Sequence, residues 1–335
     1  MVLVTGGTGL VGSHLLFHLT KAGNKVRAIY RNKAKISLVR KVFGYYIDNS
    51  DSFFNKIEWF KCDINNISLL EDAFDGITQV YHCAALISFD PRDRKKLLKI
   101  NVEGTSNIVN LCISGNIEKL SYVSSIATIG NTTDGSNANE TTEFNEALAN
   151  VYALSKYHAE MEVWRGSQEG IKVIIINPGV ILGPGFWSNG SSKIFQRVFK
   201  GLKLYPPEGT GFISVNDVVK SLVLLMNSTI TNQNYILVAE NLSYKKAFSA
   251  IALALNKKPP QQVLKKWILF ILWRLDWIKS LVTNNERILS KKMAKSFDST
   301  TVYDAEKIKA ALKLKFEDVN DYIKFCATTF LKENR

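Results

Sequence analysis

Cysteine and histidine are scarce in this chain, with four of each in 335 residues. No two cysteines form a Cys-x-x-Cys arrangement, and the histidines do not cluster with cysteines or carboxylates. We therefore predict no metal site. Three of the cysteines stand in apolar stretches, which is typical of reduced core thiols in a cytoplasmic protein.

Long apolar runs are also lacking. The longest is WILFILW, residues 267–273, and Arg274 and Asp276 soon follow it. Because a bilayer span needs about 20 apolar residues, we predict no transmembrane helix. The wider segment 265–279, KKWILFILWRLDWIK, has lysines at both ends and two interpretations. One is a buried helix, and the other is a helix over 267–278 that contacts a membrane surface.

No positively charged leader precedes the first apolar strand, MVLVT. We therefore expect no secretory signal and a cytoplasmic location. The chain is 46% hydrophobic and 22% charged, as in soluble globular proteins, and its length suits two domains. The net charge of +13 favours anionic partners such as a phosphorylated cofactor, although the charges are dispersed. No basic stripe carries interleaved aromatics, so we expect no nucleic-acid partner.

The first 32 residues predict a strand, a glycine-rich turn, a helix that ends near Gly23, and a second strand, KVRAIY. Gly6 allows a tight turn, Gly9 lets the backbone approach a pyrophosphate, and Gly12 allows close packing of helix on strand. A turn of this kind can be purely structural, but its place on the first strand favours dinucleotide binding. The predicted cofactor loop is Gly6, Gly7, Thr8, Gly9, Leu10, Val11 and Gly12.

Strands and helices then alternate along the chain. Further strands are predicted at 57–62, 79–86, 119–125, 171–178 and 234–240, with one long helix over 94–115 and another beginning near Tyr152. This alternation predicts a doubly wound parallel α/β sheet of the Rossmann type. We assign 1–178, completed by about 213–240, to the dinucleotide domain. We assign the remaining residues, 179–335 and mainly 179–212 and 241–335, to a smaller, mostly helical substrate-binding region.

The end of the second strand bears on the choice of cofactor. NAD-binding folds usually place a carboxylate there, whereas a basic side chain accommodates the 2′-phosphate of NADP. This chain has Arg31 and Lys33 and no carboxylate, which favours NADP(H) over NAD(H), unless this is only a solvated basic turn. Asp63, after the third strand, is placed to bind the adenine edge, to cap a helix, or to do both.

Two Tyr-x-x-x-Lys patterns occur, Tyr152 with Lys156 and Tyr303 with Lys307. On a helix such residues share a face, and a lysine can stabilise a phenolate that exchanges a proton with a substrate oxygen. Tyr152 follows the strand that ends at Ser124 and Ser125, on the rim where such sheets bind ligands. Tyr303 opens a charged, amphipathic helical stretch, so we favour the first pair.

Several motifs follow one another along the chain in this order: TGGTGLVG, Asp63, HCAALISF, INVEGT, VSSIATIG, YALSK and NPGVILGPG. Together they resemble the extended short-chain dehydrogenase/reductase family over nearly all of residues 1–240. The resemblance implies that Tyr152 is the catalytic acid/base and that Lys156 binds the nicotinamide ribose and lowers the tyrosine pKa. It also implies that Ser125 binds the substrate oxygen, that Asn101 supports a proton relay, and that the helices of Asn101 and Tyr152 form a homodimer. Further expected cofactor contacts are Ile64, Ala84, Ala85 and Pro178, and expected substrate contacts are Ser88, Thr128 and Asn177.

Within that family, two substrate classes compete. Nucleotide-sugar epimerases and dehydratases usually carry an Arg-Asp-Phe pattern where this chain has Thr210, Gly211 and Phe212. The turn VRAIYRN is similar to that of dihydroflavonol-4-reductases and 3β-hydroxysteroid dehydrogenases, whereas Asn177 before Pro178 resembles some epimerases. We predict an NADP(H)-dependent oxidoreductase that reduces a carbonyl, or oxidises a secondary alcohol, on a fairly apolar small molecule. The alternatives are an epimerase or dehydratase with tightly bound NAD(P) and a dinucleotide-sensing regulator without turnover, a class that typically lacks the tyrosine–lysine pair.

Overall fold

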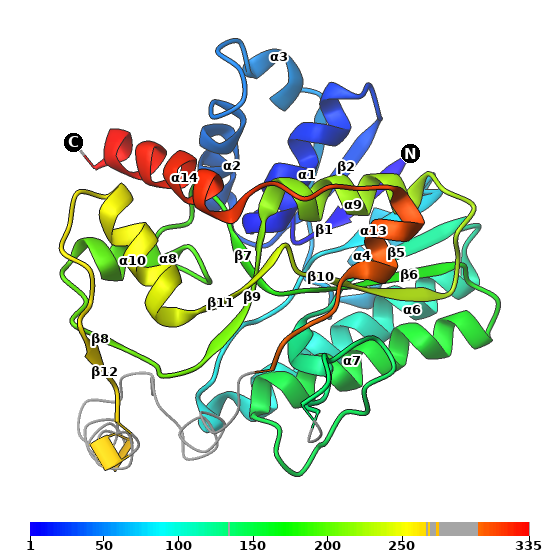
Figure 1. The fold of residues 1–335 in the computed structure, drawn as a ribbon. Helices are drawn as coiled ribbons and strands as arrows, with labels where there is room; N and C mark the ends of the chain where they lie inside the picture. The colour runs from blue at the N-terminus through cyan, green and yellow to red at the C-terminus, as the bar shows by residue number, and fades with distance from the viewer. Residues whose placement is uncertain (133–134, 266, 269–272, 275–300, 335) are drawn as a thin grey trace.

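The computed structural model of the chain describes residues 1–132, 135–265, 267–268, 273–274 and 301–334 (Figure 1). Its centre is a seven-stranded sheet of order β10-β6-β5-β4-β1-β2-β3, in which every neighbouring pair is parallel. The predicted doubly wound parallel sheet is therefore confirmed. Its strands are β1 (Val2–Thr5), β2 (Val26–Tyr30), β3 (Ile57–Lys61), β4 (Gln79–His82), β5 (Lys119–Val123), β6 (Val173–Pro178) and β10 (Gln233–Leu237).

Helices cover both faces of this sheet, as strands that are apolar throughout require. Figure 1 shows α1 and α9 on one face and α4, α6 and α7 on the other. The buried side chains accordingly form two clusters, one on each face. The helices of this part are α1 (Leu10–Lys21), α2 (Ile36–Phe43), α3 (Asp51–Phe54), α4 (Ile67–Phe74), α5 (Arg94–Leu97), α6 (Gly104–Ser114), α7 (Val151–Gln168) and α9 (Val215–Met226).

The stretch predicted as one helix over 94–115 is broken in the structure. A π-helical turn, Leu98–Glu103, separates α5 from α6. The side chain of Asn101 leaves this turn and pairs with both backbone groups of Leu86, accepting from its N–H at 2.7 Å and donating to its C=O at 3.0 Å. A π-turn of this kind often marks a functional site, because it aims one side chain away from the regular helical face.

The smaller region contains more β structure than the sequence predicts. A three-stranded sheet of order β11-β9-β7 and a β12-β8 pair accompany its helices. Its elements are β7 (Val180–Leu182), α8 (Lys193–Phe199), β8 (Leu204–Tyr205), β9 (Gly209–Ser214), β11 (Glu240–Ser243), α10 (Tyr244–Ala254), β12 (Gln262–Val263), α13 (Glu306–Leu312) and α14 (Val319–Glu333).

Most of the segment 265–279 lies outside the described residues, so neither interpretation of it is tested. Among the residues that the structure does describe, no helix is both long enough and apolar enough to cross a membrane.

The strand order fixes where a ligand can bind. β1 has β2 on one side and β4 on the other, so the connections leaving β1 and β4 run to opposite faces of the sheet. The carboxyl ends of strands at such a switch point border a crevice. The glycine turn after β1 and the segments after β4 and β5 therefore meet at one edge.

Candidate active site

The glycine turn after β1 has the geometry of a phosphate-binding loop. Gly6 has a φ of +67°, and a Cβ there would lie 2.6 Å from the backbone N of Ala84. A Cβ on Gly12 would collide with the carbonyl of Gly6. α1 begins after Gly9 with no side-chain cap and no acidic residue in its first turn. Its N-terminal N–H groups are therefore available to an anion such as a pyrophosphate.

The end of β2 is basic and open. The Arg31 guanidinium lies 3.5 Å from Asp63, with side chains that are 58% and 43% exposed. Asp63 also accepts a hydrogen bond from the Asn65 backbone at 3.0 Å. The interpretation of Asp63 as a helix cap is wrong, because Asn66 is the N-cap of α4. Lys33 lies in the 3₁₀ turn Lys33–Lys35 that follows Arg31.

Other predicted cofactor residues line the adjoining strand ends. Ile64 is buried against the start of α6, where a Cβ on Gly104 would collide with its side chain. The N–H of Ala84 donates to Thr5 Oγ1 at 3.2 Å, and Ala85 is exposed. Pro178 ends β6, where it pairs with Leu237.

Tyr152 and Ser125 are brought together at the rim. Tyr152 lies in the first turn of α7, whose N-cap Asn150 accepts from the N–H of Ala153 at 2.9 Å. The hydroxyl of Ser125 is a polar neighbour of the Tyr152 phenol. Burial raises the pKa of Tyr152 to about 12, and the interaction with Ser125 opposes this shift.

The resemblance implies that Lys156 lowers this pKa, yet the protein's own groups shift it upward. The reason is that desolvation of the phenolate outweighs the stabilisation that neighbouring groups provide.

Lys156 lies one helical turn further along α7 and is buried, with 1% of its surface exposed. Its Nζ donates to Tyr122 Oη at 2.5 Å and to the carbonyl of Val123 at 2.8 Å. Since an ammonium carries three N–H donors, one is left for a ligand hydroxyl. Burial lowers the pKa of Lys156 to about 7, while Glu160 and then Cys83 act in the opposite direction.

Asn101 joins this group through the π-turn. Its Nδ2 donates to Ser155 Oγ at 2.9 Å, and Ser155 Oγ donates to the carbonyl of Tyr152 at 2.8 Å. Asn101 thus ties α7 to the loop after β4 and is buried, with 1% exposed.

A buried carboxylate that the sequence analysis missed lies behind the site. Glu160 accepts from Ser124 Oγ at 2.5 Å, from Thr128 Oγ1 at 2.9 Å and from Asn177 Nδ2 at 2.9 Å. Ser124 therefore faces Glu160, whereas Ser125 faces Tyr152. Thr128 and Asn177, expected to touch substrate, are buried, and both side chains donate to Glu160. One available signal was position, because Glu160 follows Lys156 by four residues and so shares its helical face.

An apolar side chain stands next to Tyr152. The ring of Phe89 lies 5.5 Å from the ring of Tyr152 in an edge-on arrangement. Phe89 is 38% exposed and Ile87 is 53% exposed. Ser88, expected to bind substrate, instead donates to Asp93 at 2.6 Å.

The second tyrosine–lysine pattern has no such surroundings. Tyr303 lies before α13 begins at Glu306, so Tyr303 and Lys307 do not share a helix. Lys307 Nζ donates to the carbonyl of Asn234 at 2.9 Å. Nor does any group of three His, Cys, Asp or Glu side chains in the described part of the chain suit a metal ion.

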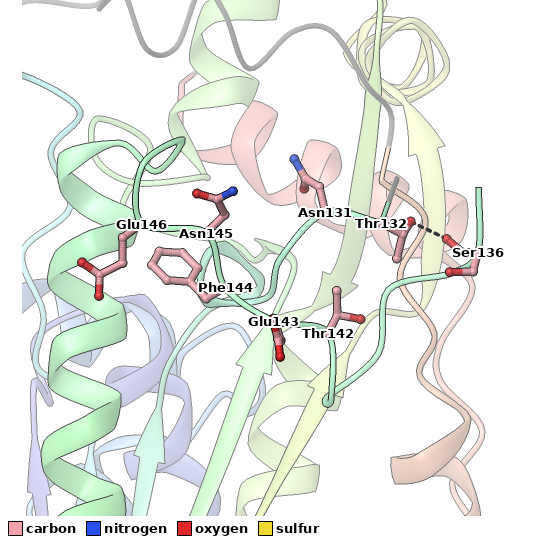
Figure 2. A pocket seen from close by; sticks show the side chains of 8 residues that line it. All are labelled: Asn131, Thr132, Ser136, Thr142, Glu143, Phe144, Asn145 and Glu146. Atoms are coloured by element: carbon pink, nitrogen blue, oxygen red, sulfur yellow. Dashed lines mark hydrogen bonds between the residues drawn. The ribbon is translucent and has the colours of Figure 1, made fainter. Parts of the chain in front are cut away.

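Figure 2 shows a separate surface hollow of about 540 Å³ on the loop that precedes α7. Its walls are polar, and Thr132 donates to the carbonyl of Ser136 across it at 2.6 Å. None of the residues around Tyr152 lines it, so we keep it apart from the active site. The lining residues are Asn131, Thr132, Ser136, Thr142, Glu143, Phe144, Asn145 and Glu146.

Comparison with known proteins agrees with this geometry. Residues 2–238 match the model of the NAD-dependent epimerase/dehydratase family. The chain is 30% identical over 274 residues to a candidate dihydroflavonol 4-reductase of Synechocystis sp., a match that covers 79% of this chain and 75% of the relative. It is 29% identical over 236 residues to an ADP-L-glycero-D-manno-heptose-6-epimerase of Brachyspira hyodysenteriae, covering 65% and 70%.

Solved structures share the fold over the whole chain. The crystal structure of gox2253 has a TM-score of 0.82 at 25% identity and covers 100% of this chain and 99% of its own. The Thermus thermophilus UDP-glucose 4-epimerase in complex with NAD has a TM-score of 0.74 at 21% identity and covers 98% of each chain. With a glycine turn between β1 and α1 and a Tyr152–Lys156 pair beside the end of β5, this chain belongs to the NAD-dependent epimerase/dehydratase family, an extended short-chain dehydrogenase/reductase enzyme.

Proposed function

We propose that the protein is an NADP(H)-dependent reductase of a carbonyl group on a fairly apolar small molecule. One observation carries this proposal: Tyr152, which faces Ser125 and is followed by the buried Lys156, has the apolar ring of Phe89 beside it. A ligand carbonyl held by Tyr152 would have this ring as an apolar neighbour.

The glycine turn fits a dinucleotide for two reasons. A Cβ on Gly6 or Gly12 would collide with backbone atoms, so the turn can be this tight only with glycine, and the first N–H groups of α1 are free to bind a phosphate. When bound, a reduced nicotinamide supplies the hydride. The third N–H donor of Lys156 would hold a ribose hydroxyl, and Arg31 would meet a 2′-phosphate at the end of β2. The exposed ion pair of Arg31 with Asp63 contributes little by itself and leaves the guanidinium free to turn towards a phosphate.

The chain's own part in the reaction is a proton transfer. As the carbonyl carbon receives the hydride, the carbonyl oxygen takes the proton of Tyr152 Oη and becomes an alcohol. Ser125 holds the same oxygen and orients it towards Tyr152. Tyr152 is left as a phenolate, which the positive charge of Lys156 stabilises until solvent returns a proton.

A nucleotide-sugar epimerase is the second candidate, because named epimerases are among the relatives. The residue that resembles their diphosphate ligand, Asn177, has no exposed surface and directs its amide to Glu160 and Thr128. Its position therefore supports the reductase over the epimerase.

A test needs purified protein, NADPH or NADH, and a panel of apolar aldehydes and ketones. We expect net loss of cofactor absorbance, faster with NADPH. The variant Tyr152→Phe should lose about 10²- to 10⁴-fold in kcat while its NADPH dissociation constant changes little. Tyr303→Phe is the matched control and should behave as wild type. Full activity of Tyr152→Phe contradicts the mechanism, and sugar-nucleotide isomerisation without net cofactor consumption supports the epimerase.

A second variant tests the cofactor choice. Arg31→Glu removes the cation and places a carboxylate where NAD-binding folds carry one. We expect the NADPH dissociation constant to rise about tenfold or more while that for NADH falls or stays unchanged. An unchanged ratio of the two constants would show that Arg31 does not meet the 2′-phosphate.

A further inference from the structure

A chain of buried polar side chains runs from Lys156 into the sheet. Tyr122, on β5, is 1% exposed, and its Oη accepts from Lys156 Nζ at 2.5 Å. Lys156 Nζ also lies 4.2 Å from the centre of the Tyr122 ring. The side chain of Thr105, at the start of α6, is a further polar neighbour of the phenol. None of these contacts follows from the Tyr-x-x-x-Lys spacing.

The hydrogen atoms in this chain can be assigned from its partners. Thr105 Oγ1 lies 2.5 Å from the carbonyl of Asn101, which cannot donate, so Thr105 supplies that hydrogen. Thr105 Oγ1 must then accept from His82 Nε2, 2.9 Å away. His82 therefore carries its hydrogen on Nε2, and its Nδ1 accepts from Thr5 Oγ1 at 2.6 Å.

The same logic fixes the direction at Tyr122. As a charged ammonium, Lys156 can only donate, so Tyr122 Oη accepts from it and its own hydrogen is free to turn towards Thr105. The His82 ring stacks on the Tyr122 ring, with centres 5.4 Å apart and planes inclined by 27°. Burial lowers the pKa of His82 to about 3, so this imidazole is neutral and adds no charge beside the lysine.

We propose that Tyr122, held in place by Thr105 and His82, is a positioning residue that fixes the ammonium of Lys156 on the cofactor side of α7 and keeps it charged. This inference goes deeper into the proposed reaction, because a charged and aimed Lys156 is what that reaction needs. The titratable groups that face Lys156 are Tyr122 on β5, His82 and Cys83 at the end of β4, and Tyr152 and Glu160 on its own helix. Among these groups, all within the described residues, Tyr122 is the one whose side chain is hydrogen-bonded to Nζ.

The variant Tyr122→Phe tests the role of the phenol. It keeps the ring beside the ammonium and removes one of its two protein acceptors, which disfavours the charged form. The pH at which Lys156 loses its proton should therefore fall by about one unit. Tyr81→Phe is the matched control, since Tyr81 is a buried tyrosine of the neighbouring strand β4 that packs in the other core cluster.

The first readout is the dissociation constant of NADPH between pH 5.5 and 9, followed by cofactor fluorescence. Binding should weaken as the pH rises through the titration of Lys156, and this inflection should move to lower pH in Tyr122→Phe and stay in place in Tyr81→Phe. An unmoved inflection in Tyr122→Phe, or an equal movement in Tyr81→Phe, overturns the proposal.

The second readout needs no cofactor and so separates this inference from the proposed function. The stability gained on replacing Lys156 by Met is measured against pH, once in the wild-type background and once in Tyr122→Phe. The pH at which that gain begins to decline reports the titration of Lys156. It should be lower by about one unit in Tyr122→Phe. If the chain fails to bind either dinucleotide but this shift is found, the proposed function fails and the present inference stands; identical profiles reject the inference alone.

Thr105 provides a rescue experiment. Thr105→Val removes the hydroxyl that anchors Tyr122 and should move the inflection in the same direction as Tyr122→Phe. Thr105→Ser retains the hydroxyl and should restore the wild-type profile, which a purely structural role of the side-chain volume would not produce. A wild-type profile for Thr105→Val would overturn the anchoring role of the Thr105–His82 pair.

Discussion

Replacement of Lys156 by Met should make the fold more stable while it removes activity. Burial lowers the pKa of Lys156 to about 7 from 10.5. Below pH 7 the lysine is charged in both the folded and the unfolded chain, so the full penalty of burying the charge applies. That penalty corresponds to about 5 kcal/mol at 1.36 kcal/mol per pKa unit.

The sign of the pH dependence follows from proton counting. Between pH 7 and 10.5 the unfolded chain binds the proton and the folded chain does not, so wild-type stability rises with pH. Methionine has no such dependence. The stability difference between the variant and the wild type should therefore shrink by about 2.7 kcal/mol from pH 7 to pH 9.

Two hydrogen bonds are lost with the ammonium, those to Tyr122 and to the carbonyl of Val123. Because both bonds stabilise the charged form, the folded-state pKa of about 7 already contains their effect on the titration. The two acceptors left without a donor lower the net gain at pH 6 to about 3 kcal/mol. The assay is urea unfolding of the cofactor-free protein at pH 6, 7, 8 and 9. Lys324→Met, at an exposed lysine of α14, is the control and should show little change at any of these pH values. If the difference in free energy of unfolding between Lys156→Met and the wild type stays constant from pH 6 to pH 9, the pKa of Lys156 is not lowered in the folded protein.

Three further outcomes are expected. Gly12→Ala should weaken dinucleotide binding at least about tenfold and destabilise the fold by about 1–3 kcal/mol, because its Cβ meets the backbone of the glycine turn. The control Gly76→Ala, in open space at a φ of +68°, should cost about 1 kcal/mol without changing binding. Cofactor titration and melting curves measure the two effects. Glu160→Ala should lower the free energy of unfolding by about 2–5 kcal/mol, since buried Ser124 loses its acceptor and Thr128 and Asn177 each lose one of theirs. A loss below about 0.5 kcal/mol would mean that the remaining partners suffice. Phe89→Ala should raise KM for apolar carbonyl substrates about 5- to 20-fold with little effect on kcat, and equal KM values would remove Phe89 from the substrate wall.

Local patterns in the sequence were enough to predict the central fold. The seven predicted strands correspond to β1–β6 and β10, because each is a short apolar run bounded by turn residues and followed by a helical pattern. The long helix over 94–115 was wrong in one respect, since the π-turn around Asn101 depends on the contacts of that side chain with Leu86, a residue on a different segment. The small sheets of the substrate-binding region were missed because β7, β8, β11 and β12 have only two to four residues each.

The site divides in the same way. The glycine turn and the Tyr152–Lys156 pair each lie within one short segment, so their spacing and their place after a strand were sufficient to single them out. The sequence alone determined that this chain has a glycine turn between its first strand and first helix, and a helix that carries a tyrosine and a lysine four residues apart.

Only the tertiary structure decided which groups surround that pair. The parallel pairing of β4 with β5 brings His82 beside Tyr122, and the packing of α6 adds Thr105. The same packing brings the amide nitrogen of Asn177 to Glu160. These contacts join residues that are distant in the chain. Strand order and helix packing determine them, because the whole sheet must be buried, and no local spacing in the sequence predicts that arrangement.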